Sequence, residues 1–152
     1  MVGYERILVP IDGSDPSETA VEHAVDIAAR YDAVVDALFV VDQTHPATSH
    51  WDMVVEEQEE TGERALDRAA EAGAAAGVTV ERHIRRGKPH EEIVDAAADY
   101  GSDLIVMGTH GRTGLDRFAS TGSVTERVVR ITAVPTLVVG GTQSAIADPA
   151  SE

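Results

Sequence analysis

Short apolar runs alternate with longer amphipathic stretches along the whole chain. The first apolar run covers residues 4–11 and ends in the turn sequence Asp12-Gly13-Ser14, as a buried strand followed by a loop does. The next stretch repeats apolar residues three and four positions apart, the spacing of one helix face: Ala20, Val21, Ala24, Ile27 and Ala28. We therefore expect a strand at 4–11 and then a helix with Asp15 as its N-cap and Pro16 in its first turn.

The same alternation predicts four more strands and three more helices. The strands are expected at residues 33–41, 78–85, 103–107 and 135–139, and the helices at 53–76, after the turn at 87–89, and from Ser123 onward. Residues 78–85 alternate polar and apolar side chains, which indicates an edge strand, whereas the apolar run at 103–107 indicates a central one. Asp36 is the only charged residue within 33–41. We expect it near the start of that strand or on an accessible face.

Predicted helices separate the predicted strands from one end of the chain to the other. No change in composition, internal repeat or low-complexity linker divides residues 1–141, so we expect one α/β domain. Helical crossovers make the five-stranded sheet parallel and doubly wound, with four helices on its faces. Ligands of such sheets bind beyond the carboxyl ends of the strands, where residues 12–14 and 108–122 place small polar side chains. The polar residues 142–152 are expected to form a disordered tail.

Charge changes the expected surface. Acidic residues outnumber basic residues 27 to 12, the formal net charge is −15, and Lys88 is the only lysine. This composition argues against nucleic-acid binding, and it destabilises a compact chain by self-repulsion unless salt screens the charges. We therefore expect a protein from a halophile. The alternative is an ordinary protein whose acidic surface serves only to keep it soluble. The glutamates of the helix at 53–76 would form a solvated face: Glu56, Glu57, Glu59, Glu60 and Glu63.

Several kinds of protein are excluded or disfavoured by residues that are absent or badly spaced. Without cysteine there is no disulfide, thiolate metal site or cysteine nucleophile. No apolar run approaches the roughly 18 residues of a membrane helix, and the start of the chain does not resemble a signal peptide, so we expect a soluble cytoplasmic protein. The six histidines fall on different predicted elements, so no zinc site held by protein groups alone is expected. With 4% aromatic residues, few side chains could stack on a flavin.

The glycine-rich segment 108–122 carries the richest candidate chemistry. Its glycines allow backbone amides to approach a ligand closely, and Ser123 follows at the start of a predicted helix, where free N–H groups and a partial positive charge suit phosphate. Arg112, Arg117 and the hydroxyl groups of Ser123 and Thr125 could add donors. The alternative is a mobile loop whose serine only caps the helix. The segment has neither the lysine of a Walker A loop nor the glycine spacing of a dinucleotide fingerprint.

Four segments in order resemble the universal stress protein family. They are ILVPIDGS at 7–14, DLIVMGTHG at 103–111, GSVTERVV at 122–129 and VPTLVV at 134–139, and the resemblance extends over nearly all of residues 4–140. It implies a fold of the adenine nucleotide alpha hydrolase type with strand order 3-2-1-4-5. It also implies ATP as ligand, with Mg²⁺ or Mn²⁺ held through the nucleotide phosphates, and a homodimer formed through the strand at 135–139.

The resemblance further implies which residues form the nucleotide site. Asp12 would contact the ribose or the adenine, with Pro10 and Ile11 beside the base. The backbone of Val40 and Val41 would contact the adenine edge. Met107 and Gly108 would line the ribose side, and the phosphates would be held by Gly111, Arg112, Gly122, Ser123, Val124 and Thr125. His110, within the glycine-rich segment, is the one histidine expected near the ligand. For Asp12, the alternative is a solvated turn residue.

One spacing departs from the pattern of the ATP-binding branch of the family. Gly108 and Gly111 keep the expected separation, but ten residues instead of nine separate Gly111 from Gly122. We expect the extra residue, within 118–121, to bulge into solvent and leave ATP binding intact. The expected function is a nucleotide-binding stress-response or signalling module with little or no catalysis. The alternatives are a homodimeric interaction protein that does not bind ATP, and a weak ATPase that uses Asp12 or His110.

Overall fold

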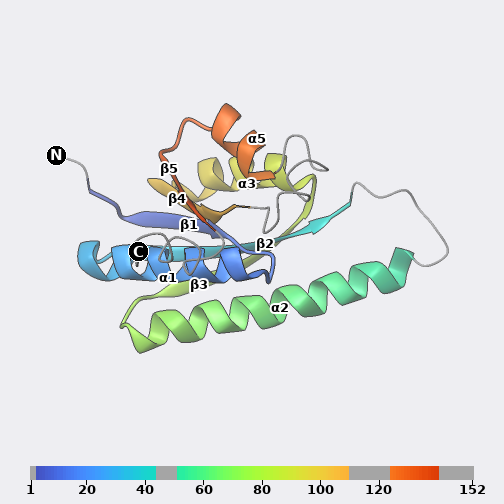
Figure 1. Ribbon diagram of the computed structural model, residues 1–152, viewed down its shortest axis with the longest axis horizontal. Coiled ribbons are helices and arrows are strands. Elements are labelled where there is room, and N and C mark those ends of the chain that lie inside the picture. The colour runs from blue at the N-terminus through green and yellow to red at the C-terminus, as the bar shows by residue number, and fades with distance from the viewer. Residues whose placement is uncertain (1–2, 44–50, 110–123, 141–152) are drawn as a thin grey trace, which may run out of the picture.

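Five parallel strands form one sheet in the order β3-β2-β1-β4-β5 (Figure 1). The computed structural model describes residues 3–43, 51–109 and 124–140, with the side chains of residues 51–55 excepted. The strands are β1 (Arg6–Pro10), β2 (Val34–Asp42), β3 (Val80–Gly87), β4 (Leu104–Gly108) and β5 (Thr136–Val139). The predicted parallel sheet and its strand order are confirmed. β3 is an edge strand, as expected. β4, which was expected to be central, is an interior strand beside the middle strand β1.

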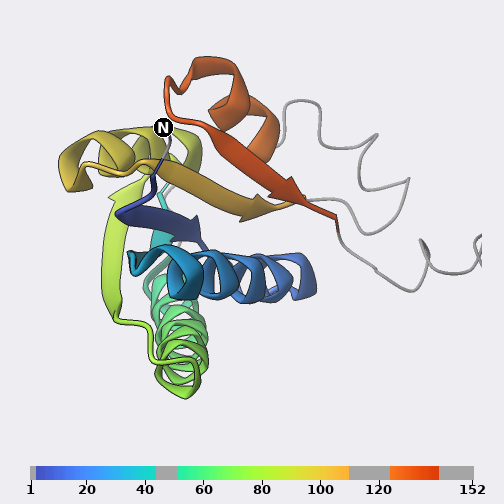
Figure 2. The ribbon, with the colours of Figure 1, turned by 90° about the vertical axis from the view of Figure 1, so that its left-hand side faces the viewer.

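Helices cover both faces of this sheet. They are α1 (Asp15–Tyr31), α2 (Trp51–Ala75), α3 (Pro89–Tyr100) and α5 (Val124–Ile131). Figure 2 shows α1 and α2 on one side and α3 and α5 on the other. Successive residues of β1 point to opposite faces, so Ile7 and Val9 pack in the core under α1 and α2, while Leu8 packs with Ile93 of α3 and Val128 of α5. None of the helices within the described ranges is long and apolar enough to cross a membrane.

Two glycines allow α2 to lie close to the sheet. A Cβ atom on Gly62 would lie 2.4 Å from Cδ2 of Phe39 in β2, and one on Gly73 would lie 2.3 Å from Cγ2 of Val80 in β3. No real side chain tolerates such distances, so glycine at both positions sets how closely the helix approaches. This approach brings the first half of α2 to the carboxyl end of β2 (Figure 1).

The N-terminus of α1 differs from the sequence prediction by one residue. Ser14, with an extended backbone, is the N-cap, and its Oγ accepts the N–H of Ser17 at 3.4 Å. Asp15, the predicted cap, is already the first helical residue, and Pro16 follows it. Both residues are suitable caps, and the hydrogen bonds of the preceding turn decide between them, because Ser14 is held there by Asp12.

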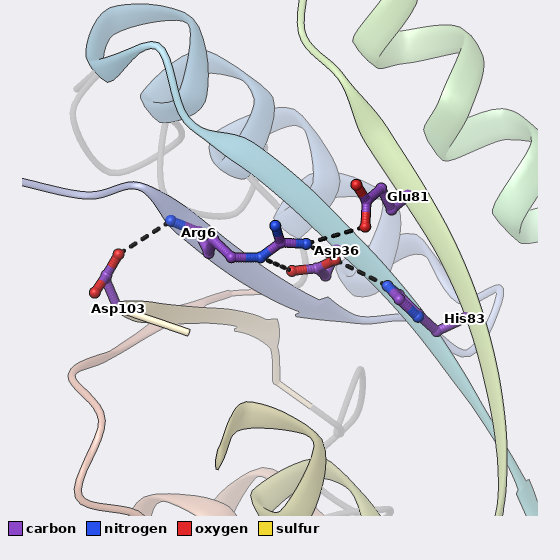
Figure 3. Close-up of polar contacts among 5 residues, drawn as sticks. All are labelled: Arg6, Asp36, Glu81, His83 and Asp103. Carbon is purple, nitrogen blue, oxygen red and sulfur yellow. Dashed lines mark hydrogen bonds and ion pairs between the residues drawn. The ribbon is translucent and has the colours of Figure 1, made fainter. Parts of the chain in front are cut away.

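Asp36 lies near the start of β2, which was one of the two expected positions, but it is fully buried, so the alternative of an accessible face is wrong. Figure 3 shows Arg6 of β1 paired with it through two bonds, Nε to Oδ2 at 3.0 Å and Nη2 to Oδ1 at 2.7 Å. His83 of β3 places Nε2 2.8 Å from Oδ1 of the same carboxylate, and Arg6 also contacts Glu81 at 3.0 Å. A buried charge persists when it is paired and hydrogen-bonded, and here the partners come from the two neighbouring strands.

Candidate functional site: a cavity at the carboxyl ends of the strands

A cavity of about 470 Å³ opens at the carboxyl ends of β1, β2 and β4. Its volume lies in the range of pockets for small molecules. α1 follows β1 onto one face of the sheet, and α5 lies on the other face after β4, so the cavity is at the topological switch point where ligands of such sheets bind. Most of the predicted site residues line it: Pro10, Ile11, Asp12, Val40, Met107, Gly108, Val124 and Thr125.

The remaining predicted residues are of two kinds. Val41 does not line the cavity, because its side chain is fully buried in the core under α1 and α2. The others lie outside the described residues: His110, Gly111, Arg112, Gly122 and Ser123. The spacing between Gly111 and Gly122 therefore also falls outside the described part of the chain, as does the predicted tail at 142–152.

Asp12 is held by the turn between β1 and α1. Its Oδ1 accepts the backbone N–H of Ser14 at 2.9 Å and the Ser14 hydroxyl at 2.6 Å, and its own N–H donates to Ser17 Oγ at 3.3 Å. Gly13 between them has φ +85°, a conformation that favours glycine. Oδ2 has no hydrogen-bond partner among the described residues. Asp12 is thus both a turn residue and an oriented, exposed carboxylate at the cavity.

The backbone of β2 passes into the cavity at Val40. The last hydrogen bond from the β1 segment to β2 runs from the N–H of Ile11 to the carbonyl oxygen of Leu38, at 2.8 Å. Backbone groups of alternate residues in a strand point to the same side, so Val40 directs its N–H and C=O the same way as Leu38, just beyond the end of β1. Val41 points the opposite way, toward β3, where it is in register with Arg86.

The end of β4 is enclosed by the N-termini of two helices. A Cβ atom on Gly108 would lie 2.5 Å from both the carbonyl carbon and the oxygen of Pro16 in α1. On the other face, the Thr125 hydroxyl of α5 donates to the Gly108 carbonyl oxygen at 2.8 Å. The single Thr125 hydroxyl proton is used in that bond, so it positions the first turn of α5 and would reach a phosphate only if the bond opened.

Helices α2 and α3 contribute lining residues that sequence reasoning missed. They are Glu57, Gln58 and Thr61 of α2 and Pro89 and Ile93 of α3. Gln58 Oε1 accepts the backbone N–H of Asp42 at 3.1 Å. The one available signal was periodicity, because Gln58, Thr61 and Ala65 recur at the spacing of a single helix face. The acidic sequence around them favoured a solvated face instead.

The charged residues that line the described part of the cavity are all acidic: Asp12, Asp42 and Glu57. The remaining lining residues are apolar or uncharged polar. Such a surface has hydroxyl and amide groups for a sugar and a base, but in the described ranges it offers no lysine, arginine or histidine to a phosphate. The candidate cations His110, Arg112 and Arg117 lie outside those ranges.

Comparison with known proteins gives a consistent result. The sequence model of the universal stress protein family matches residues 3–140. The chain is similar to universal stress protein MJ0531 of Methanocaldococcus jannaschii, with 41% identity over 140 residues, which cover 90% of this chain and 82% of the relative.

Solved structures resemble this fold over almost their full length. Universal stress protein UspA of Lactobacillus plantarum superimposes with a TM-score of 0.75 at 32% identity, covering 91% of this chain and 99% of that one. A universal stress protein solved in complex with cAMP has a TM-score of 0.75 at 28% identity, and the match covers 93% of this chain and 100% of that one.

Proposed function

This chain belongs to the universal stress protein family, and we propose that it binds an adenine nucleotide, with ATP as the expected ligand, in the cavity at the carboxyl ends of β1, β2 and β4. One observation carries the proposal. Residues of three segments that are distant in sequence, 7–14, 103–111 and 122–129, line a single cavity of about 470 Å³. These are three of the segments on which the family resemblance rests. The related protein solved with cAMP supports an adenine nucleotide as the ligand class.

The chemistry of the cavity favours binding over rapid catalysis. Phosphoryl transfer needs positive groups on the phosphates and a residue that orients the attacking group. The described lining residues include no lysine, arginine or histidine, and Asp12 already uses one carboxylate oxygen in the turn. We therefore propose a stress-response or signalling module in which nucleotide binding matters more than turnover. A weak ATPase would depend on Asp12 or His110. Steady-state phosphate release from Asp12→Asn and His110→Ala variants tests that alternative, which fails if neither change reduces hydrolysis.

A divalent cation fits this donor set. Mg²⁺ and Mn²⁺ prefer oxygen ligands and bind nucleotides mainly through phosphate oxygens and water. The three carboxylates that line the described part of the cavity repel an uncompensated triphosphate. A bound cation would supply positive charge that offsets both the phosphates and these carboxylates, so we propose that ATP binds together with Mg²⁺ or Mn²⁺.

Titration calorimetry of ATP with Mg²⁺ into the protein at molar KCl tests the proposed function. We expect binding with a Kd in roughly the micromolar range. A variant lacking one residue of 119–121 is expected to bind no more tightly, because a surplus residue that bulges into solvent does not alter the phosphate contacts. Binding only by the deletion variant would favour the interaction-protein alternative, and binding by neither protein would overturn the proposal.

We also propose a homodimer formed through β5. This strand is at the edge of the sheet, and its Leu137 and Val138 are 38% and 40% exposed. An exposed apolar edge strand is a template for pairing with another chain. Light scattering at molar salt is expected to give twice the 16.1 kDa mass of one chain, and a Leu137→Lys variant is expected to be monomeric. A wild-type mass of one chain would contradict the proposal.

A further inference from the structure

Gln58 is brought to the end of β2 by the packing of α2. Gly62 permits the close contact between α2 and Phe39. Gln58 precedes Gly62 by one helical turn and therefore lies on the same face of the helix. From there its side chain reaches the backbone of Asp42, three residues beyond Phe39, and lines the cavity in a half-buried position.

The orientation of the Gln58 amide is set by a backbone donor. The N–H of Asp42 can donate only to an acceptor, so Oε1 rather than Nε2 faces it, at 3.1 Å. Oε1 retains a second lone pair, and the two N–H groups of Nε2 have no hydrogen-bond partner among the described residues. Gln58 is also the only described lining residue with a side-chain N–H donor. The cavity therefore contains an oriented amide with one acceptor site and two donors available to a ligand.

The Val40 backbone lies next to this amide along β2. Val40 and Asp42 direct their backbone groups to the same side of the strand, because they are two residues apart. The N–H of Asp42 is used by Gln58, whereas the N–H and C=O of Val40 face the cavity beyond the end of β1. A base that contacts the backbone of Val40 would therefore also meet Gln58.

We propose that Gln58 recognises the N6/N7 edge of a bound adenine, with Nε2 donating to N7 and Oε1 accepting one N6 hydrogen. This inference rests on the proposed function. A glutamine amide matches the adjacent donor and acceptor of adenine in this bidentate way. The second N6 hydrogen and N1 remain for the C=O and N–H of Val40. Guanine carries the acceptor O6 in place of the amino group, so it would set one oxygen against another at Gln58.

The inference is tested with ATP and 7-deaza-ATP, in which a C–H group replaces N7. We expect wild-type protein to bind 7-deaza-ATP about tenfold more weakly than ATP, the range that one hydrogen bond gives. Gln58→Met keeps the length of the side chain but removes both hydrogen-bonding atoms, so it is expected to bind the two nucleotides equally. The same variant should also bind ATP about tenfold or more weakly than wild-type protein does, and any preference for ATP over GTP should be smaller.

Controls separate recognition from folding and from the proposed function. Glu60→Gln changes an exposed residue of the same helix that does not line the cavity, and it should bind like wild type. Circular dichroism without nucleotide checks that Gln58→Met is folded. If wild-type protein binds ATP and 7-deaza-ATP equally, this inference fails while the proposed function stands. If wild-type protein binds no adenine nucleotide, both fail.

Discussion

Replacing Arg6 with methionine is expected to lower the free energy of unfolding by about 3 kcal/mol, the lower end of the cost of breaking a buried ion pair. The change leaves Asp36, which is fully buried, without its bidentate partner. His83 remains at 2.8 Å, but one imidazole does not replace two guanidinium bonds. The bond to Asp36 also raises the pKa of Arg6, so the arginine remains charged throughout the ordinary pH range. Urea unfolding at fixed salt measures the effect.

A second substitution distinguishes loss of a partner from loss of the pair. In the double variant Arg6→Met with Asp36→Leu, no uncompensated buried charge remains, because Glu81, the other partner of Arg6, is exposed to solvent. We therefore expect most of the stability to return. Arg30→Met is the matched control, because Arg30 forms an exposed pair with Asp26 one turn away on α1, and such pairs contribute little. If Arg6→Met were no less stable than Arg30→Met, the Arg6–Asp36 pair would not stabilise the sheet.

Replacing Gly108 with alanine is expected to reduce stability by about 3 kcal/mol, at the upper end for overpacking, and to abolish nucleotide binding. The added methyl group would lie 2.5 Å from backbone atoms of Pro16, and backbone at the start of a helix cannot move aside as a flexible side chain can. The end of β4 would have to shift away from α1, and with it the Thr125 bond that positions α5. Thermal unfolding and ATP titration report the two effects.

The neighbouring strand supplies a control for this prediction. Gly140 follows Val139, the residue in register with Gly108, and a Cβ atom there would meet nothing within 4 Å. Gly140→Ala should therefore be nearly as stable as wild type and bind ATP equally. A Gly108→Ala protein with wild-type stability and affinity would show that α1 and β4 are not tightly packed at the cavity.

The two ends of the sheet have different roles. The carboxyl ends of β1, β2 and β4 form the cavity. Near the opposite end, Arg6, Asp36 and His83 connect the three adjacent strands β1, β2 and β3 (Figure 3). There the carboxylate of Asp103 also accepts the backbone N–H groups of Glu5 and Arg6, at 2.8 and 3.0 Å. Because Arg6 already occupies the space between Asp36 and Glu81, we interpret this cluster as an internal ion-pair network that fixes strand register.

Local pattern was enough to predict a parallel α/β sheet and the place of its cavity, whereas the strand order came from the family resemblance. Apolar runs and the spacing of apolar residues three and four positions apart record which side of an element is buried. The succession of strands and helices along the chain could therefore be predicted, with bounds correct to within a few residues. The same pattern located the turn at residues 12–14 and the end of the strand at Gly108. Because parallel strands bring their carboxyl ends together, these two places were expected to meet at one ligand site. The adaptation to salt expected from the composition stays a prediction.

Contacts between distant residues decided the rest. Asp36 is buried because Arg6 and His83, 30 and 47 positions away in sequence, satisfy its charge, and no local pattern contains that information. Gln58 lines the cavity because Gly62 lets α2 approach Phe39, although the acidic sequence around it is typical of a solvated face. A sequence records the burial preference of each residue, but partners that satisfy a buried charge or orient an amide exist only once the strands and helices have packed.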